Sequence, residues 1–508
     1  MNPVKYKHGK TTKAAFGDFQ TPLDLAKEIC AHLVKKNVHF KSVLEPNCGI
    51  GSFLIAAADI FPHLEKIVGA DINTEHLNSA KQDLKDNKHH NKVEFINKDF
   101  FHNDWEALLK TLPEPILLIG NPPWVTNSGL SVLGSNNRPH KSNFQDFKGL
   151  DAVTGKSNFD ISEWMLNKEI EWISGMQRTV AMLCKISVAR KVLLRAWNQK
   201  FCLGGAEIYY IDASKHFGAS VDACLLVVHG TNKETEFQCK VYKSLQHNEP
   251  DTIIGYADNH LIADMEAFNR GKHLEGKSQY QWRSGIKHDC AKVMELTRQE
   301  NGYRNGLGEL IELEPDYLYP MLKGSQIANG PRKDRHLWML VPQQHPSDET
   351  ISIRFDAPKT WEYLVEHSDL LDRRASSIYK KRSRFSVFGV GDYSFAKWKV
   401  AISGFYKKLD FKVVGPYEGK PVVFDDTCYF LACQSEEEAV FLAKLYNCDV
   451  AKDFYSAFIF WDEKRPINLG ILKRLNIIKL SEELKTASTL NALFQKNNQD
   501  SMQLSLFP

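Results

Sequence analysis

The stretch VLEPNCGIGSFLIAAADIF, residues 43–61, is where the sequence first shows its fold. An apolar run over 41–46 predicts a short strand, and a loop with Gly49 and Gly51 follows it. The apolar spacing over 52–61 then predicts a helix. A strand, a glycine loop and a helix in this order are typical of a doubly wound α/β sheet that binds its ligand beside the loop.

The same alternation continues through about residue 230. Further strands are expected at 66–72, 93–100, 115–124, 178–184, 206–213 and 222–230, and helices at 74–87, 162–173 and 188–200. Strands and helices of these lengths in alternation predict a Rossmann-like, mostly parallel α/β sheet. The last two strands are joined by only eight residues. We therefore expect an antiparallel hairpin at one edge of the sheet.

The composition is that of an ordinary globular protein. Of the 508 residues, 43% are hydrophobic and 25% are charged, with a net charge of +3. The alternating pattern gives way after about Lys243 to shorter, aromatic-rich strands and more loops. We therefore predict a first domain over 1–245, a mixed α+β second domain over 246–495 and a loose polar tail over 496–508.

The sequence carries no sign of a membrane segment, a signal peptide or a metal centre. No apolar run approaches the thickness of a bilayer, and the N-terminal residues lack an apolar signal core, which predicts a cytoplasmic protein. The ten cysteines are scattered singly, without a CxxC pair or a Cys/His cluster at zinc spacing. We therefore expect reduced thiols and no structural metal.

Three consecutive strand ends carry residue types that suit a nucleoside. Glycines at the first strand end let a ligand approach the backbone, and Asp71 ends the second strand, where a carboxylate can accept from ribose hydroxyls. Asp99 and Phe100 end the third strand and offer an acceptor for an exocyclic amine and a ring face for a purine. Glycines after a strand often serve only the turn, but the order of these groups predicts an adenosine site.

NAD and S-adenosylmethionine both contain an adenosine. A pyrophosphate cradle favours GxGxxG at a helix N-terminus. Here Phe53 and Leu54 follow the second glycine instead. Because S-adenosylmethionine has no phosphate, it is the better match and the expected cofactor.

The fourth strand stops abruptly at Asn121-Pro122-Pro123-Trp124. An adenine amino group is a poor nucleophile, since its lone pair is delocalised into the ring. The Asn121 side-chain oxygen and the Pro122 carbonyl can accept both N–H hydrogens, which favours a pyramidal nitrogen with its lone pair aimed at an electrophile. Trp124 offers a face on which the base can stack. Pro-Pro also occurs in simple turns, but after three ligand-shaped strand ends the catalytic interpretation is favoured.

The motifs EPNCGIGSF, GADIN, NKDFF and NPPW, in this order, resemble those of the S-adenosylmethionine-dependent N6-adenine methyltransferases of DNA. More narrowly, the chain is similar to those of the γ arrangement, which include the modification enzymes of type II restriction-modification systems. The resemblance implies a catalytic domain followed by a target-recognition domain, and methylation of a flipped-out adenine in double-stranded DNA. We expect a monomer whose cognate endonuclease is a separate polypeptide. Trp124, where Tyr or Phe is commoner, and Cys48 inside the glycine loop depart from the family pattern.

The resemblance also implies a set of site residues. At the cofactor it implies Thr21, Pro22, Glu45, Asn47, Gly49, Gly51, Asp71, Ile72, Asp99 and Phe100. Around the target base it implies Asn121, Pro122 and Trp124, with Phe217 as a second stacking ring.

The second half carries the cations expected to meet DNA. Residues 373–408 hold ten Lys or Arg, one acidic residue and eight aromatics. A charge run is often only a solvated face, but cations interleaved with rings suit phosphates and bases. Most of the expected contacts go to phosphate. The candidates are Arg283, Lys287, Arg382, Arg384 and Lys399. The polar stretch 126–158 is expected either to close over DNA or to form a surface loop.

Other functions share parts of this pattern. A protein glutamine methyltransferase or an RNA adenine methyltransferase would use the same tetrad, and a catalytically silent DNA-binding relative would keep only the fold. The basic second half favours DNA, and the intact tetrad favours an active enzyme. Nuclease activity is not expected, because no acidic-x-Lys triplet follows Pro315-Asp316 nearby.

Overall fold

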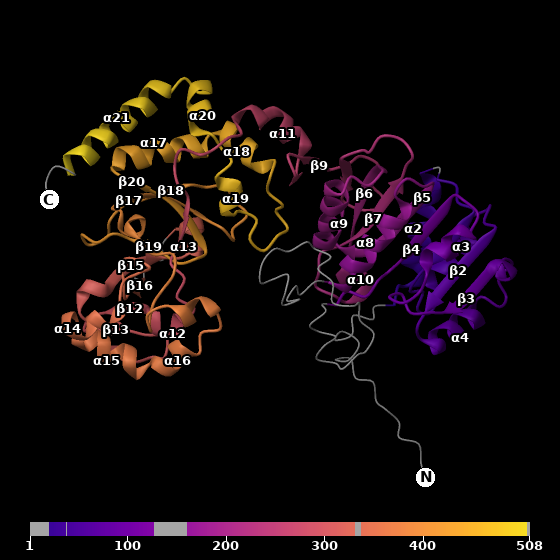
Figure 1. Ribbon diagram of the computed structural model, residues 1–508, viewed down its shortest axis with the longest axis horizontal. Coiled ribbons are helices and arrows are strands. Elements are labelled where there is room, and N and C mark those ends of the chain that lie inside the picture. Colours follow the sequence, from indigo (N-terminus) through magenta and orange to yellow (C-terminus); the bar gives the residue numbers. More distant parts are fainter. Residues whose placement is uncertain (1–19, 37, 126–159, 331–336, 505–508) are drawn as a thin grey trace, which may run out of the picture. The chain divides into compact units, whose positions relative to one another are not determined.

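The computed structural model describes residues 20–36, 38–125, 160–330 and 337–504, with the side chains of the last helix described as far as Lys496. The chain divides after Met265 into two compact units (Figure 1). The sequence placed this division at residue 245. The later division follows from strands that the alternating pattern did not reveal and that extend the first sheet. The stretch 126–158 lies outside the described residues.

The first unit holds the predicted alternation of strands and helices. Its strands are β1 (Ser42–Glu45), β2 (Lys66–Asp71), β3 (Val93–Asn97), β4 (Ile116–Gly120), β5 (Arg178–Lys185), β6 (Leu203–Ile211), β7 (Ala223–Gly230), β8 (Gln238–Tyr242), β9 (Thr252–Ala257) and β10 (His260–Ile262). Its helices are α2 (Leu23–Lys35), α3 (Ser52–Ile60), α4 (Thr74–Asp83), α5 (Trp105–Lys110), α8 (Ile161–Ile173), α9 (Ile186–Asn198) and α10 (Ala213–Phe217), and α11 (Met265–Gly271) begins at the division.

Within the described residues, the strands of the first unit form one sheet of ten, in the order β10-β9-β8-β6-β7-β5-β4-β1-β2-β3. Strands β1 to β5 are parallel, as predicted. The predicted hairpin of β6 and β7 exists, but it does not lie at the edge. Strand β7 inserts antiparallel between β5 and β6, and β8 pairs parallel with β6. Three short strands therefore continue the sheet beyond the hairpin.

The strand order puts a topological switch point between β1 and β4. From β1 the chain proceeds outward to β2 and β3, whereas β4 and β5 lie on the other side of β1. In open α/β sheets, ligands bind outside the carboxyl ends of the strands at such a point. The carboxyl ends of β1, β2 and β4, which carry the predicted motifs, therefore meet at one edge of the sheet.

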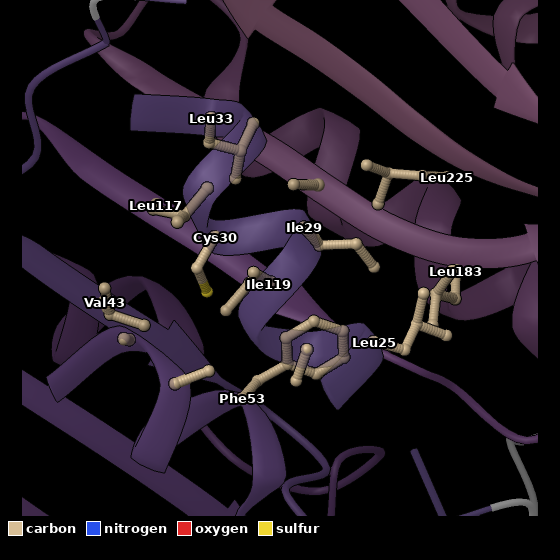
Figure 2. Packing of buried hydrophobic residues seen from close by; sticks show 14 of the residues in the cluster. Leu25, Ile29, Cys30, Leu33, Val43, Phe53, Leu117, Ile119, Leu183 and Leu225 are labelled. Carbon is tan, nitrogen blue, oxygen red and sulfur yellow. The ribbon is translucent and has the colours of Figure 1, made fainter. Parts of the chain in front are cut away.

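The core beneath this edge is packed by α2, a helix that was not among the predicted elements. Leu25, Ile29 and Leu33 recur at helical spacing and are buried against strand residues such as Leu117 and Ile119 of β4 (Figure 2). Full burial of one such side chain contributes about 1.5–3 kcal/mol. Helix α2 begins directly after Pro22, so this packing fixes the position of Gln20, Thr21 and Pro22 beside the sheet.

The second unit is mixed α+β. Within the described residues it contains a sheet in the order β11-β20-β17-β18 and another in the order β14-β13-β12-β16-β15-β19. Its strands are β11 (Arg283–Ser284), β12 (Glu295–Gln299), β13 (Gly302–Arg304), β14 (Leu310–Ile311), β15 (Leu318–Leu322), β16 (Leu337–Leu340), β17 (Trp398–Ser403), β18 (Lys412–Val414), β19 (Val423–Phe424) and β20 (Cys428–Cys433). Its helices are α12 (Ala291–Met294), α13 (Gly324–Asn329), α14 (Ile353–Asp356), α15 (Pro358–Glu366), α16 (Ser368–Asp372), α17 (Glu436–Asn447), α18 (Asp449–Ser456), α19 (Leu469–Leu472), α20 (Ile477–Glu483) and α21 (Ala487–Leu504).

Helix α21 differs from the predicted loose tail. It runs through residue 496 and ends only at Leu504. The sequence of α21 contains no glycine or proline, so nothing in its backbone stops a helix that starts at Ala487. None of the described helices is both long and apolar enough to cross a bilayer.

Candidate functional site

The glycine loop between β1 and α3 is shaped by its neighbours. Gly49 and Gly51 both have positive φ, +51° and +81°. A Cβ at Gly51 would lie 2.8 Å from the Cβ of Ala80 in α4, so this glycine is required for helix packing. A Cβ at Gly49 would lie within 2.4 Å of Oε1 of Gln20. Gly51 is therefore needed for the structure of the loop itself, whatever ligand the loop holds.

Gln20 is a site residue that sequence reasoning missed. Its Oε1 accepts a hydrogen bond from the Ile50 backbone N–H at 3.2 Å, which ties the segment before α2 to the glycine loop. Thr21 is buried beside it, and Pro22 caps the start of α2. The available signal was its place in GDFQTP, directly before the two residues that were singled out.

Asp71 organises the same loop from the end of β2. Its Oδ2 accepts from the Gly49 N–H at 2.9 Å, and its Oδ1 accepts from the Asn73 N–H at 2.7 Å. A carboxylate has about four acceptor positions, so capacity remains for two hydroxyl donors. Ile72, the next residue, is 53% exposed at the rim of this edge. Asp71 thus lies where a ribose contact was predicted and also holds the loop in shape.

Asp99 and Phe100 follow β3, but their side chains already contact other residues of the protein. Asp99 accepts from the Phe101 N–H and contacts Nδ1 of His102. The Phe100 ring is 7% exposed and tilts against Trp105 and Trp172, with ring centroids 5.5 and 5.6 Å away. The prediction of an open Phe100 face for a purine is therefore wrong for this arrangement, because Trp105 of the next helix and Trp172 of the distant α8 take up the ring.

Glu45 and Asn47 place acceptor atoms under the loop. Oε2 of Glu45 and Oδ1 of Asn47 are buried and make no hydrogen bond within the described part of the chain. Burial raises the pKa of the Glu45 carboxyl well above its usual range, and the nearby Asp71 carboxylate raises it further. Gly120 at the end of β4 lies beside Glu45, since a Cβ there would be in van der Waals contact with the Glu45 Cγ at 3.5 Å.

The NPPW tetrad leaves the sheet directly after Gly120. Asn121 is half-buried and Pro122 is buried. The Trp124 indole is 6% exposed, and its N–H donates to the Leu183 carbonyl of β5 at 3.4 Å. Asn121 and Pro122 therefore lie at the predicted strand end, next to the β1 edge.

Trp124 and Phe217, the two rings expected to stack on the target base, contact each other edge to face. The ring centroids are 5.3 Å apart at an interplanar angle of 68°. Phe217 ends the short helix α10 and is half-buried. A base stacked between two rings needs about 7 Å, twice a van der Waals contact of about 3.5 Å. Stacking on both rings thus requires Phe217 to move.

A second feature missed by sequence reasoning fastens the end of the tetrad. Nζ of Lys185, the last residue of β5, donates to the Trp124 carbonyl at 3.3 Å and to Oδ2 of Asp160 at 2.5 Å. The Ile161 N–H donates to the Val125 carbonyl at 2.9 Å. No local pattern connects these residues, because they are brought together only by the pairing of β4 with β5.

The second unit holds the predicted DNA contacts in different environments. Arg283 lies over the Tyr393 ring at 4.4 Å and donates to Gln281 at 2.6 Å. Arg384 is exposed and pairs with Asp372 at 2.6 Å. Lys287 is partly exposed and pairs with Asp289 at 3.4 Å, and Arg382 is exposed and donates to the Pro346 carbonyl. These four side chains have access to solvent, as contacts to DNA would require.

Arg374, counted with the cations of the basic segment, is structural. Its guanidinium lies over the Tyr379 ring at 3.8 Å. It donates to the backbone carbonyls of His288 and Ser386 at 3.2 and 2.8 Å. It therefore fastens the basic segment to the chain around Lys287.

Lys399 is not a DNA contact, and its prediction is wrong. It is 1% exposed as the second residue of β17, and its Nζ donates to the carbonyls of Ala396 and Val422. Strand β17 is buried on both faces from Lys399 to Ser403, so no side chain in this range can reach solvent. Burial lowers its pKa to about 7.

This burial predicts a stability that depends on pH. The Lys399 pKa is about 7 in the folded protein and about 10.4 in an unfolded chain. Between these values the unfolded form binds more protons, so raising the pH from 7 toward 10 stabilises the folded form, by at most about 1.4 kcal/mol per pH unit. Below pH 7 this contribution does not vary.

Lys399→Met should remove this contribution to the pH dependence of the unfolding free energy. We expect the unfolding free energy of the wild type, measured by denaturant titration, to rise relative to that of the variant from pH 7 to 10. Lys397→Met, at an exposed lysine just before β17, should leave the pH dependence unchanged. A difference between wild type and Lys399→Met that is constant across this range would contradict the expectation.

Comparisons with known proteins bear on this arrangement. The N-6 DNA Methylase family matches residues 6–172. The type II methyltransferase M.NspV from Nostoc sp. is 44% identical over 475 residues, which cover 93% of this chain and 98% of that protein. The chain belongs to the N-6 DNA methylase family. It is thus a type II DNA methyltransferase, as the motif order predicted.

Two further likenesses are more distant. An uncharacterised protein of Mycoplasma pneumoniae, the MG259 homolog, is 33% identical to this methyltransferase over 118 residues, covering 23% of the chain and 24% of that protein. A solved structure of the type IIL restriction-modification enzyme MmeI in complex with DNA aligns with a TM-score of 0.49 and 14% identity, covering 92% of this chain and 65% of that one. The γ arrangement stays a prediction.

The site of this methyltransferase fits a cofactor that carries an ammonium group and a ribose. Two buried acceptor atoms, on Glu45 and Asn47, lack partners in the described chain, and Asp71 retains acceptor capacity. Hydroxyl and ammonium donors satisfy such acceptors. Among the described residues, no group of three or more His, Cys, Asp or Glu side chains is arranged to hold a metal ion.

Proposed function

We propose that this methyltransferase transfers a methyl group from S-adenosylmethionine to N6 of an adenine flipped out of double-stranded DNA, and so protects DNA in a restriction-modification system. The observation that carries the proposal is the meeting of two strand ends at the switch point. The end of β1 leads into the loop held by Asp71, and the end of β4 presents Asn121 and Pro122 beside it. The proposed cofactor site and the two groups that would accept from the adenine amine are thereby adjacent.

The cofactor's part is to supply an electrophilic methyl group on a sulfonium. The residues expected to hold it are Glu45 and Asn47 toward its ammonium, Asp71 toward its ribose and Asp99 toward its adenine. Thr21, Pro22, Ile72 and the glycine loop complete the surroundings. Positioning of this kind can supply several kcal/mol of a displacement barrier without a general base.

The amine is activated by acceptors. The side-chain oxygen of Asn121 and the carbonyl of Pro122 would take the two N–H hydrogens of the adenine amine, leaving its lone pair free to attack. Because both acceptors are neutral, no carboxylate is asked to remove a proton before transfer. The product ammonium is acidic, so its proton leaves afterwards to solvent.

The target base is expected to stack on Trp124. Extruding it costs a few kcal/mol, which stacking offsets by about 1–3 kcal/mol. The edge-on contact of Phe217 at 5.3 Å fills the space next to the indole. Binding of the base therefore displaces Phe217 to a position where its own face can stack on the other side.

DNA itself is expected to meet the exposed cations of the second unit. Arg382, Arg384 and Lys287 are placed as contacts to phosphate, which hold the duplex without reading it. Arg283 is held by Tyr393 and Gln281. Such a preoriented guanidinium suits a bidentate contact to a guanine edge.

The proposal is tested by transfer to DNA. The purified full-length protein would be incubated with labelled S-adenosylmethionine and unmethylated genomic DNA, which is then digested to nucleosides. We expect label in N6-methyldeoxyadenosine, and modification-sensitive sequencing should place it in one short sequence context. Label found on protein or RNA alone would rule the proposal out.

Cofactor binding should release a proton from Glu45. Its carboxyl has a pKa raised well above the usual range by burial and by Asp71, whereas an ammonium placed against it favours the ionised form. Calorimetric titration with S-adenosylmethionine at pH 7, in two buffers of different ionisation enthalpy, should show release of up to about one proton per site.

Glu45→Gln is the matched control for this titration. It keeps the shape of the side chain, so it should bind more weakly and release no proton. Equal binding enthalpies of the wild type in both buffers would contradict the assignment of Glu45 to the ammonium.

A further inference from the structure

The tetrad depends on groups outside it for its shape. After Gly120 the strand ladder between β4 and β5 ends, since Gly120 pairs with Met182 and no later pair is formed. The two prolines donate no backbone hydrogen bonds. The direction of Trp124, and of the two residues that would hold the amine, must therefore be set by contacts made beyond the ladder.

Lys185 provides the central contact. It lies three residues after Met182, at the end of β5, and its ammonium donates to the Trp124 carbonyl at 3.3 Å. Two residues before Lys185 in the same strand, the Leu183 carbonyl accepts from the Trp124 indole N–H at 3.4 Å. The side chain and the backbone carbonyl of Trp124 are thus both held by the last three residues of β5.

Asp160 holds the ammonium in place. Its Oδ2 accepts from Lys185 at 2.5 Å, and its Oδ1 accepts from the Ser162 N–H at 3.1 Å, which caps helix α8. The Asp160 side chain is 9% exposed and that of Lys185 25%. A charge-assisted hydrogen bond that is largely shielded from solvent is stronger and more directional than a surface pair.

The backbone adds a second connection between the same segments. The Ile161 N–H donates to the Val125 carbonyl at 2.9 Å. Residues 124–125, 160–161 and 183–185 are therefore joined at one point, immediately after the proposed catalytic groups. A cation at this point fixes the carbonyl of Trp124, and through two rigid prolines it fixes the orientation of Asn121 and Pro122.

We propose that Lys185, held by Asp160, is a positioning residue for methyl transfer: it orients the tetrad and does not touch the substrate. The inference rests on the proposed function. Its consequence is specific, because an orienting group acts on the rate of transfer from the bound complex. Misplacement of reacting groups by about 1 Å costs about 100-fold in rate.

The test compares Lys185→Met with a matched variant in the full-length protein. Lys191→Met breaks another lysine–carboxylate pair of the same helix α8, between the exposed Lys191 of α9 and the buried Glu163 at 3.2 Å. We expect Lys185→Met to lower kcat about 100-fold with KM for DNA and the Kd of S-adenosylmethionine changed by less than about threefold. Lys191→Met should leave kcat unchanged, and Lys185→Arg, which keeps the cation, should recover much of the lost rate.

Amide hydrogen exchange supplies a readout that does not need turnover. The Ile161 amide should exchange faster in Lys185→Met than in Lys191→Met, since its acceptor segment is released. Unchanged exchange at Ile161, a loss confined to KM, or equal effects of the two variants on kcat would overturn the positioning role. A wild-type protein that methylates no adenine would refute the proposed function instead, while the exchange result would still report on the contact itself.

Discussion

Replacing Asn121 by alanine should abolish most methyl transfer while leaving cofactor binding intact. The side-chain oxygen of Asn121 is one of two acceptors proposed for the adenine amine, and the other is a backbone carbonyl that the substitution leaves in place. Loss of one preorganised hydrogen-bonding group at a reaction centre costs about 10²- to 10³-fold in kcat. The residue lies directly after β4, whereas the glycine loop is held by Asp71 at the end of β2.

Two measurements separate this role from others. Single-turnover transfer to methylatable DNA should fall in Asn121→Ala, while the Kd of S-adenosylmethionine, measured by calorimetry, should stay within about twofold of the wild-type value. Asn121→Asp retains an oxygen acceptor and should keep more activity than the alanine variant. If Asn121→Ala weakened cofactor binding as strongly as transfer, Asn121 would belong to the cofactor pocket and the proposed amine contact would be wrong.

Replacing Asp71 by alanine should have the opposite effect, a large loss of cofactor affinity. Its carboxylate accepts from the backbone N–H groups of Gly49 and Asn73 and is proposed to accept from the ribose as well. Hydrogen bonds to a charged group contribute about 1.5–3 kcal/mol each. A loss of about 2.8 kcal/mol corresponds to a Kd about 100-fold higher.

The control for this variant is Asp59→Ala. Asp59 also holds two partners, Lys27 at 3.0 Å and Asn87 at 2.8 Å, but it lies at the end of α3, whereas the glycine loop lies at the start of this helix. Equilibrium binding of S-adenosylmethionine should be unchanged in Asp59→Ala and weakened in Asp71→Ala. Asp71→Asn, which keeps one acceptor oxygen, should lie between them. Equal affinities for wild type and Asp71→Ala would show that the ribose is bound elsewhere.

Much of the first unit followed from the sequence because its signals are local. The apolar run and glycine loop of 43–61 predicted β1 and α3, and the run before the tetrad predicted the start of β4 within one residue, although the strand ends at Gly120 and not at Trp124. A strand buried on both faces needs consecutive apolar residues, so its pattern can be read without a partner. The hairpin was also predicted, but its position inside the sheet depends on three later strands whose short segments carry weak periodicity.

The errors share a different physical cause. Lys399 was counted as a DNA contact because cations are usually exposed, yet the pairing of β17 turns it into the core. Phe100 was expected to offer a face to a purine, yet Trp172, from a helix far along the chain, packs against it. Arg374 was counted with the cations, although it serves the backbone of the basic segment. In each case at least one contact partner is distant in sequence: Val422 for Lys399, Trp172 for Phe100 and His288 for Arg374.

The sequence by itself determined the fold class, the order of the motifs and the residue types at each strand end, because these depend on periodicity and on neighbours within a few positions. It also placed Asn121, Pro122 and Asp71 at the edge where the chemistry is proposed. Only the tertiary structure decided which groups meet there. The contacts of Gln20 with Ile50 and of Lys185 with Trp124 and Asp160 join segments 25 to 61 residues apart, and such contacts exist only once the sheet has set the register of its strands.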